Sequence, residues 1–269
     1  MKLQEIISAL NSYGADNSKE EAFLIIEELY KIPRAKILAD KEKSYTSPRI
    51  SEILEKRKER IPLQYILGKW EFMGKEFLVS PDCLIPRPDT EILVEKALEI
   101  IEKGDSVADF CTGSGCIGVS LGIYKPNIDL TLVDISRGAL EISKKNAQRH
   151  NISARFILGD ITKDLVGEKF DVIVSNPPYI PSKDIEGLSP EVKKEPRLAL
   201  DGGENGLDII NFLVNDGMEL LKDNGKMLIE FGYDQEKSIR ECLENNQKIA
   251  SYEIFYDYGS NPRCVLIYK

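Results

Sequence analysis

The sequence has little of what several classes of enzyme and binding protein require. Of its 269 residues only one is histidine, and its five cysteines include no Cys-x-x-Cys pair. An odd number of unpaired cysteines argues against a zinc ribbon or a secreted disulfide framework. His150 follows Arg149 at the expected end of a surface helix. We therefore expect neither a Ser-His-Asp hydrolase nor a metal site.

The sequence also lacks a net positive charge and long hydrophobic runs. Lys and Arg number 36 against 45 Asp and Glu, a net charge of −9, which disfavours a protein that binds mainly the backbone of nucleic acids. No apolar run approaches the ~20 residues of a membrane span. The first 21 residues lack the apolar core and cleavage site of a signal peptide. These absences predict a cytoplasmic protein that is not associated with a membrane.

The N-terminal part has the pattern of a small helical domain. Ser18 and Glu21 fit a capping box before an apolar stripe, and Pro33 is expected to end that helix. Ser47 followed by Pro48 predicts the start of another helix. Between residues 65 and 80 the spacing of apolar residues changes from that of a helix to that of a strand. Gly74-Lys75 is the expected turn of a β-hairpin. The predicted organisation is a helical domain, a hairpin connector and a larger domain, over residues 1–64, 65–84 and 85–269.

From Ser106 onward, predicted strands and helices alternate, which indicates a parallel sheet covered on both faces. The last two strands are joined only by residues 257–262, so they must be antiparallel if they are neighbours. The expected fold is α/β, with a mostly parallel sheet and an antiparallel last strand. The strands are expected at residues 107–110, 130–133, 155–158, 170–174, 227–231, 252–256 and 264–268.

A glycine-rich turn follows the first of these strands. Gly113, Gly115 and Gly118 form a G-x-G-x-x-G pattern, which allows a tight turn and close approach to a ligand. Asp134 lies 21 residues after Gly113, where a carboxylate can accept both hydroxyls of a ribose. The pattern alone is compatible with a dinucleotide. Asp109, just before the turn, suits a cationic ligand such as the amino group of S-adenosylmethionine better than a pyrophosphate, which favours a methyltransferase.

The segment Asn176-Pro177-Pro178-Tyr179, here called the Asn-Pro-Pro-Tyr motif, follows the fourth predicted strand and is expected beside the glycine-rich turn. Its groups suit the methylation of a planar, weakly nucleophilic nitrogen. The side-chain oxygen of Asn176 and the carbonyl of Pro177 can accept both N–H bonds of an amide or exocyclic amine. Tyr179 can pack against the planar group. Catalysis would then come from positioning and electrostatics, without a strong base.

With these motifs the sequence resembles the HemK/PrmC family, the protein-(glutamine-N5) methyltransferases that modify class I peptide chain release factors in translation termination. The resemblance covers nearly the whole chain. DNA adenine methyltransferases share the Asn-Pro-Pro-Tyr type but not the surrounding set. Besides that motif, the resemblance rests on Pro62-Leu63-Gln64-Tyr65-Ile66-Leu67-Gly68, Ile85-Pro86-Arg87-Pro88-Asp89-Thr90-Glu91, Glu195-Pro196-Arg197-Leu198-Ala199-Leu200-Asp201-Gly202-Gly203 and Gly259-Ser260-Asn261-Pro262-Arg263.

The resemblance implies a Rossmann-like class I methyltransferase fold, S-adenosylmethionine as cofactor and a release-factor glutamine in a Gly-Gly-Gln loop as substrate. It implies that the helical domain recognises the release factor and that Arg87 belongs to a segment that closes over the cofactor. The implied cofactor residues are Asp109, Cys111, Thr112, Gly113, Ser114, Gly115, Asp134, Asp160, Ile161 and Asn176. The implied substrate residues are Arg87, Asn176, Pro177, Pro178 and Tyr179, of which Asn176, Pro177 and Tyr179 carry the catalysis.

One residue departs from the family pattern, and three other functions compete. Cys111 stands where the family usually has glycine, and a Cβ there is expected to require a negative φ. An adenine-N6 nucleic-acid methyltransferase would share the chemistry, but the net charge disfavours it. A nicotinamide oxidoreductase leaves the Asn-Pro-Pro-Tyr motif unexplained, and a non-catalytic binding module leaves both motifs idle. We expect a monomer without direct nucleic-acid binding.

Overall fold

The computed structural model describes residues 1–257 and 259–269, and it divides into two compact units. A helical unit comprises Met1–Gly68 together with Ser189–Lys194, and a larger unit comprises Lys69–Leu188 with Glu195–Lys269. The first boundary falls four residues after the expected one, and the insertion of residues 189–194 into the helical unit is not visible in the sequence. In the described ranges no helix has the length and apolar character needed to cross a membrane.

The helical unit packs its helices around one apolar core that includes Leu10, Ile26 and Ile53. The hydroxyl of Ser47 accepts a hydrogen bond from the amide of Arg49, so the predicted cap is present. The predicted capping box at Ser18 is wrong, because Ser18 is already helical and its hydroxyl donates to Asn11. The helices are α1 (Leu3–Ser12), α2 (Ser18–Tyr30), α3 (Arg34–Ala39), α4 (Pro48–Lys58) and α5 (Leu63–Leu67).

A buried arginine ties the inserted segment to this unit. The side chain of Arg57 in α4 is only 2% exposed, and it lies 2.7 Å from Glu21 of α2 and 3.1 Å from Glu191. Arg60 also pairs with Glu191, at 2.6 Å. Burying a guanidinium is costly unless it is paired and hydrogen-bonded. Glu191 is therefore part of what makes this helical unit stable, although it lies more than 130 residues further along the chain.

The larger unit begins with a two-stranded antiparallel hairpin of β1 (Lys69–Phe72) and β2 (Lys75–Leu78). The hairpin was expected, but its turn lies at Met73-Gly74, one residue before the predicted position. Phe72 and Phe77 pack edge to face, with ring centroids 6.1 Å apart. Both rings are buried and join the core of the larger unit. The hairpin is therefore an integral part of that unit rather than a free connector.

The main sheet has seven strands in the order β5-β4-β3-β6-β7-β9-β8. The first five are parallel, and β9 is antiparallel to both β7 and β8, as expected. Tyr258, in the expected link between the last two strands, lies outside the described residues. The strands are β3 (Ser106–Phe110), β4 (Asp129–Asp134), β5 (Arg155–Leu158), β6 (Phe170–Ser175), β7 (Leu221–Glu230), β8 (Ser251–Tyr256) and β9 (Pro262–Tyr268).

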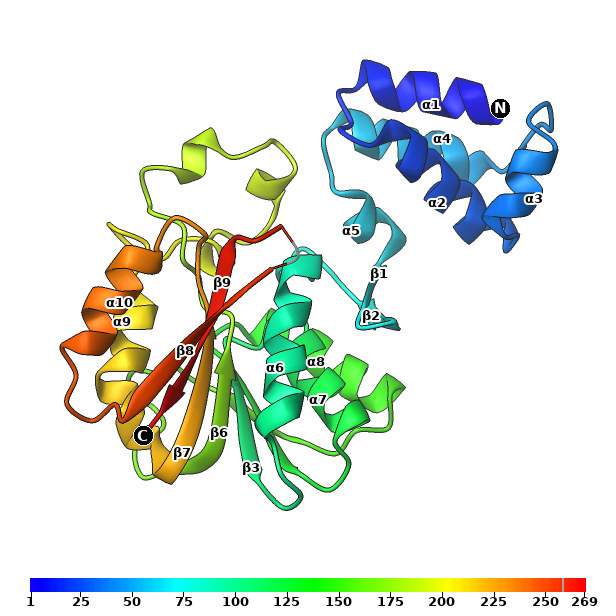
Figure 1. Ribbon diagram of the computed structural model, residues 1–269. Helices are drawn as coiled ribbons and strands as arrows, with labels where there is room; N and C mark the ends of the chain where they lie inside the picture. Colours follow the sequence, from blue (N-terminus) through cyan, green and yellow to red (C-terminus); the bar gives the residue numbers. More distant parts are fainter. Residues whose placement is uncertain (258) are drawn as a thin grey trace. The chain divides into compact units, whose positions relative to one another are not determined.

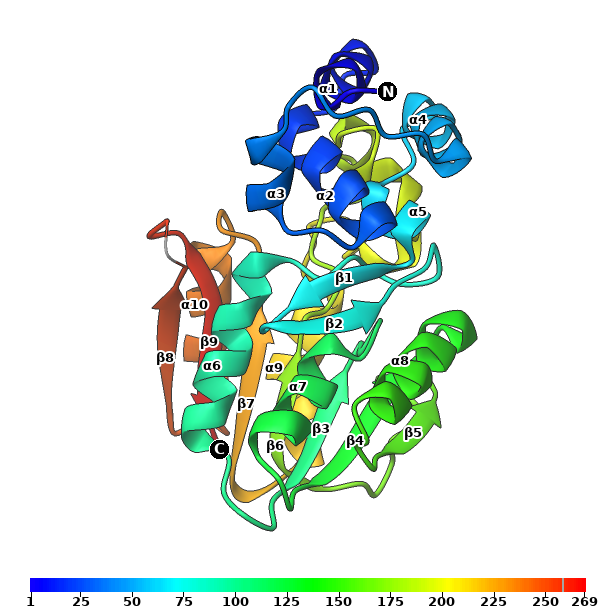
Figure 2. The same cartoon turned by 90° about the vertical axis from the view of Figure 1, so that its right-hand side faces the viewer.

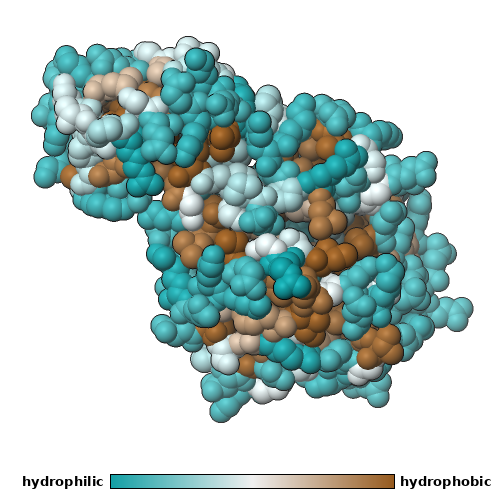
Figure 3. Space-filling view, turned by 180° about the vertical axis from the view of Figure 1, so that it is seen from behind, coloured by the Kyte–Doolittle hydropathy of each residue, from teal (hydrophilic) through white to brown (hydrophobic). Residues whose placement is uncertain are grey.

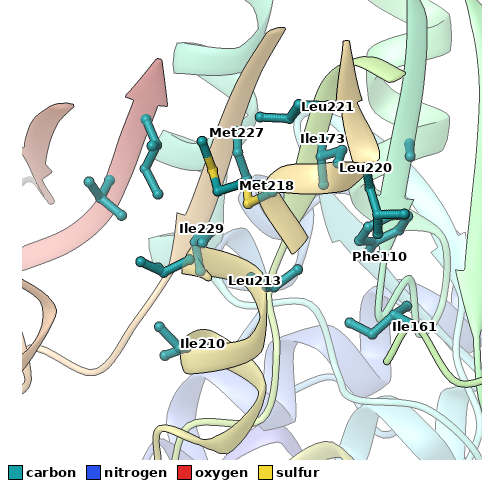
Figure 4. Close-up of a cluster of buried hydrophobic side chains, with 14 of the residues drawn as sticks. Phe110, Ile161, Ile173, Ile210, Leu213, Met218, Leu220, Leu221, Met227 and Ile229 are labelled. Atoms are coloured by element: carbon teal, nitrogen blue, oxygen red, sulfur yellow. The ribbon is translucent and has the colours of Figure 1, made fainter. Parts of the chain in front are cut away.

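Helices cover both faces of this sheet (Figures 1 and 2). Two buried clusters result, one on each face, and Figure 4 shows part of the cluster that α9 closes, with Phe110 of β3 and Leu213 of α9. The face of the molecule drawn in Figure 3 also carries hydrophobic surface on the larger unit. The helices are α6 (Glu91–Ile100), α7 (Cys116–Tyr124) and α8 (Arg137–Arg149) on one face, and α9 (Asp208–Val214) and α10 (Glu236–Glu244) on the other.

Candidate active site

A pocket of about 270 Å³ lies in the larger unit at the carboxyl ends of β3, β4 and β6. This is the edge of an open parallel sheet at which ligands bind. The pocket brings together most of the residues selected from the sequence. Those that line it are Arg87, Cys111, Thr112, Gly113, Ser114, Asp134, Asp160, Ile161, Asn176 and Pro178. Asp109, Gly115, Pro177 and Tyr179 are not in its lining.

Asp109 braces the glycine-rich turn from behind. Its Oδ2 accepts hydrogen bonds from the Thr112 hydroxyl at 2.6 Å and the Gly118 amide at 2.9 Å. The side chain is fully buried, and this burial raises its pKa to about 7 against the effect of both hydrogen bonds. These hydrogen bonds let Asp109 fix the shape of the turn, and the role expected for it, a contact with a ligand ammonium group, stays a prediction.

The glycines of the turn are required by close contacts. Gly115 has φ +79°, and a Cβ there would lie 2.8 Å from the Cβ of Ser143 in α8. At Gly118 an added Cβ would lie 3.0 Å from the Asp109 carboxylate. Gly115 thus allows α7 and α8 to pack closely, which explains why it belongs to the motif without lining the pocket.

Cys111 adopts the left-handed conformation, with φ +58°. The expectation of a negative φ is therefore wrong: the turn keeps the backbone that glycine would favour, and the cysteine is forced into it. An L residue in this region carries a steric cost of about 1–2 kcal/mol. Burial raises the pKa of the Cys111 thiol, so that it is protonated at neutral pH and a poor nucleophile.

Asp134, the last residue of β4, is held by the backbone around the pocket. Its Oδ2 accepts from the amide of Gly113 and its Oδ1 from the amide of Ser136, both at 2.8 Å. Burial raises its pKa, and the backbone hydrogen bonds oppose this rise. A carboxylate oxygen has two acceptor directions, so each oxygen can still receive a ligand hydroxyl. This fixed pair of oxygens at the end of a strand suits a vicinal diol.

Asp160 and Ile161 lie after β5 on the next side of the pocket. The Asp160 carboxylate accepts from the Thr162 amide at 2.9 Å, from the Thr162 hydroxyl at 2.7 Å and from Lys163 at 2.7 Å. These donors, led by Lys163, lower its pKa to about 2. Asp160 is therefore an ionised acceptor across the physiological range. Ile161 is buried and offers an apolar surface beside it.

The amide of Asn176 has a defined orientation. Its Nδ2 donates to the hydroxyl of Thr90 at 3.2 Å. Among residues 1–257 and 259–269, no donor reaches its Oδ1. The Thr90 hydroxyl is thus the acceptor that anchors the amide N–H₂. The side-chain oxygen is left for a ligand.

The backbone of the Asn-Pro-Pro-Tyr motif is held by packing as well as by hydrogen bonds. Gln235 donates from Nε2 to the carbonyl of Tyr179 at 2.9 Å and to that of Gly206 at 3.1 Å. A Cβ at Gly202 would lie 2.7 Å from the Pro178 carbonyl, and one at Gly206 would lie 2.2 Å from the Tyr179 carbonyl. Only glycine at positions 202 and 206 allows this part of the chain to approach the motif so closely. The contacts restrict the conformations of both segments.

Two arginines join the other sequence motifs of the larger unit through ion pairs. Arg87 pairs with Glu195, whose second oxygen accepts from the Ile85 amide at 3.0 Å. Arg263 pairs with Asp89 at 3.1 Å and with Asp257 at 2.9 Å. The segments around residues 85–91, 195–203 and 259–263 are therefore connected through charges next to the pocket.

Several lining residues were not selected from the sequence, because they lack any chemical signature or belong to loops whose approach depends on the tertiary fold. Thr90 belongs to the segment Ile85–Glu91, but no role at the site was predicted for it. Glu230, which contacts Tyr179 but does not line the pocket, had one signal: it is a carboxylate in the otherwise apolar run Met227–Phe231. The unselected lining residues include Cys83, Leu84, Ile135, Ala139, Leu198 and Ile209.

Comparisons with known proteins agree with this arrangement. A family model described as the PrmC N-terminal domain matches residues 2–68, and one described as the methyltransferase small domain matches residues 88–189. Among solved structures, a methyltransferase from Pyrococcus furiosus aligns with a TM-score of 0.56 and 19% identity, over 80% of this chain and 98% of that one. The larger unit therefore has the fold of class I methyltransferases.

Sequence relatives define the family. The release factor glutamine methyltransferase of Moorella thermoacetica is 36% identical over 274 residues, which cover 99% of this chain and 97% of that protein. The enzyme of the same description from Aquifex aeolicus is 36% identical over 273 residues, with 99% and 95% coverage. The chain belongs to the release factor glutamine methyltransferase family.

The conformation of Cys111 leads to a stability prediction. Cys111→Gly should be more stable than Cys111→Ala by about 1 kcal/mol, because alanine keeps the Cβ that is strained at positive φ. Urea unfolding of both variants measures the difference. At Cys83, which has no positive φ, the order should reverse, since glycine loses more conformational entropy on folding. Equal stabilities of the two Cys111 variants would show that the left-handed conformation carries no strain.

Proposed function

We propose that this protein transfers a methyl group from S-adenosylmethionine to the side-chain amide nitrogen of the glutamine in the Gly-Gly-Gln motif of class I release factors. The observation that carries the proposal is the oriented amide of Asn176 at the pocket edge. Its nitrogen is bound to Thr90, and its oxygen is left to accept from a substrate N–H. Family membership supports the same substrate.

The pocket suits S-adenosylmethionine in the distribution of its groups. Asp134 offers two positioned oxygens for a ribose, and Asp160 with Ile161 offers an acceptor and an apolar wall for an adenine. The glycine-rich turn lies beside β4, where the methionine part would pass. We propose these residues, with Cys111 to Ser114, as the cofactor site. When bound, S-adenosylmethionine supplies an electrophilic methyl group.

The chain's own contribution is to position the substrate amide. Asn176 Oδ1 and the Pro177 carbonyl would accept the two N–H bonds of the glutamine, which fixes the plane of its nitrogen. Prolines at 177 and 178 have no backbone N–H, so the motif presents acceptors rather than donors here. Tyr179 is held by Gln235 and would support the planar group. The proton becomes acidic as the new C–N bond forms, so positioning suffices without a strong base.

The helical unit is proposed as the surface that recognises the release factor outside the Gly-Gly-Gln loop. A short loop offers little binding area, and remote contacts can supply the rest of the affinity. The family model that matches residues 2–68 supports a dedicated N-terminal domain. Arg87 is proposed to contact the substrate from its place at the pocket. The monomeric state, the cytoplasmic location and the lack of nucleic-acid binding stay predictions.

The experiment that tests the function uses the full chain, labelled S-adenosylmethionine and a purified class I release factor. The expected product is a single methyl group on the glutamine, located by mass mapping, and a Gly-Gly-Ala release factor should accept none. A short Gly-Gly-Gln peptide should show a higher KM than the intact factor if the helical unit contributes affinity. Methylation of adenine in DNA or RNA, with none on the release factor, would overturn the proposal.

Replacing Asp134 tests the cofactor site. Asp134→Ala should weaken S-adenosylmethionine binding by about 1.5–3 kcal/mol, because hydrogen bonds to a charged acceptor are lost. Calorimetry measures the affinity. Asp129→Ala, at the exposed start of the same strand, is the matched control and should bind normally. Tight binding of NAD with none of S-adenosylmethionine would contradict the cofactor assignment.

Replacing Asn176 separates positioning from base catalysis. Asn176→Ala should reduce methyl transfer about 10²-fold, since misplaced reacting groups cost that much. Asn176→Asp should also transfer the methyl group slowly. It loses the N–H₂ group that donates a hydrogen bond to Thr90, and it places a carboxylate near the sulfonium, which stabilises the charged ground state.

Both Asn176 variants should still bind cofactor, and calorimetry checks that they are folded. Asn245→Ala, at an exposed asparagine, should retain full activity. A rate for Asn176→Asp that equals the unmodified rate and rises through a carboxylate pKa would mean that a general base operates.

A further inference from the structure

The charges around the pocket are mostly negative, and one arginine is the exception. Asp82, Asp134 and Asp160 line the pocket. Among the described residues of the lining, Arg87 is the only one with a positively charged side chain. S-adenosylmethionine, the cofactor proposed above, carries a carboxylate on its methionine part besides its ammonium and sulfonium groups. The aspartates attract the two cations but repel this anion, so the carboxylate needs another partner.

The backbone amides of the glycine-rich turn do not meet this need. A turn before a helix binds anions when its amides are free to donate. Here the Thr112 amide donates to the Val133 carbonyl at 3.0 Å, and the Gly115 amide donates to the Thr112 carbonyl at 2.8 Å. The Gly113 amide donates to Asp134 at 2.8 Å. These three amides already have acceptors within the protein, so a positively charged side chain is the better partner for a carboxylate.

Arg87 is held at the pocket by Glu195. The side chain of Glu195 is only 2% exposed, and its Oε1 pairs with Nη2 of Arg87. Its Oε2 accepts from the Ile85 amide at 3.0 Å. Pro86 and Pro88 flank the arginine and restrict its backbone, which is extended with φ −104° and ψ 142°. Both the backbone of Arg87 and one nitrogen of its guanidinium are therefore fixed.

The rest of the guanidinium is available to a ligand. A guanidinium has five N–H donors, and in residues 1–257 and 259–269 only Nη2 of Arg87 has a hydrogen-bond acceptor. The side chain is 34% exposed. Thr90, three residues further on, lines the same pocket and binds Asn176. Because the transferred methyl group must face Asn176, Arg87 lies near the methionine end of the proposed cofactor site. Its planar fork matches the geometry of a carboxylate.

We propose that Arg87, held in place by Glu195, binds the carboxylate of the methionine part of S-adenosylmethionine. Arg87 is the binding residue, and Glu195 is a positioning residue that acts through it. The inference rests on the cofactor of the proposed function and deepens it, because it names the residue that recognises the amino-acid end. A contact of Arg87 with the release factor, also proposed above, is a separate role that requires no effect of Arg87 on cofactor affinity.

The test compares S-adenosylmethionine with decarboxylated S-adenosylmethionine, which lacks only the carboxylate, by calorimetry on the full chain. The unmodified protein should bind the first about tenfold more tightly, the lower end of the range for hydrogen bonds to charged groups, because Arg87 is partly exposed. Arg87→Ala should weaken only S-adenosylmethionine, so that the ratio of the two affinities falls to about one or below. Arg87→Lys keeps the charge without the planar fork and should give an intermediate ratio. A purely structural effect would weaken both ligands alike.

Replacing Glu195 tests the positioning. The Ile85 amide and Arg87 approach different oxygens of its carboxylate, so Glu195→Gln presents an N–H₂ group to one of these two donors. The affinity ratio should fall about threefold, and the double variant with Arg87→Ala should have the ratio of Arg87→Ala alone, because Glu195 acts through Arg87.

The matched control is Arg155→Ala, which removes another arginine that pairs with a glutamate, Glu168, in the larger unit. Its affinity ratio should equal that of the unmodified protein. The inference is overturned if Arg87→Ala keeps the unmodified ratio, and a rise only in the KM for the release factor would then assign Arg87 to the substrate alone. It is also overturned if both ligands weaken equally. If the unmodified protein binds neither ligand, the proposed cofactor is wrong and this inference fails with it.

Discussion

The parallel pairing of β3 with β4 on one side and with β6 on the other determines where the polar groups of the pocket lie. Phe110, Val133 and Ser175 are matched in register, so the loops that follow the three strands leave the sheet at one level. The glycine-rich turn, Asp134 and Asn176 are therefore adjacent although they span more than sixty residues of sequence. The proposed ribose acceptor and the proposed amide acceptor thus come together at one edge of the sheet.

This arrangement requires several polar groups to be buried within a largely apolar unit. Asp109 and Glu230 lie at the carboxyl ends of β3 and β7, and burial raises the pKa of each to about 7. Each has a defined task in the backbone or side-chain geometry: Asp109 shapes the turn, and Glu230 contacts the Asn-Pro-Pro-Tyr motif. Both side chains are buried, which disfavours their charged forms, and each keeps one carboxylate oxygen without a hydrogen-bond partner among the described residues.

Much of the fold was predictable because it depends on local patterns. The alternation of strands and helices, the antiparallel last strand and the cap at Ser47 follow from periodicity and composition, and β5 was placed at its observed bounds. The start of β7 was missed by six residues, since Lys222, Asp223 and Asn224 resemble a turn. Their exposure explains this, because an exposed strand segment has no apolar signal.

The site was predictable where residues act through their own chemistry and not where they act through contacts. Asp134 and Asn176 were selected from motif spacing, whereas the roles of Asp109 and Thr90 depend on which neighbours the fold brings to them. Cys111 is a residue whose type led to a wrong prediction of its backbone conformation. The glycine-like backbone of the turn is imposed by its surroundings, so the residue type alone did not reveal the positive φ.

The helical unit shows the same dependence on tertiary contacts, because it is built from two segments that lie far apart in the sequence. Residues 189–194 belong to it, and Glu191 supplies charge to Arg57 and Arg60. Only three residues separate Glu191 from Glu195, which pairs with Arg87 and the Ile85 amide in the larger unit. The segment that follows the Asn-Pro-Pro-Tyr motif therefore contributes one carboxylate to each unit. Contacts within the helical unit and contacts around Arg87 in the larger unit thus use carboxylates that are four positions apart in the chain.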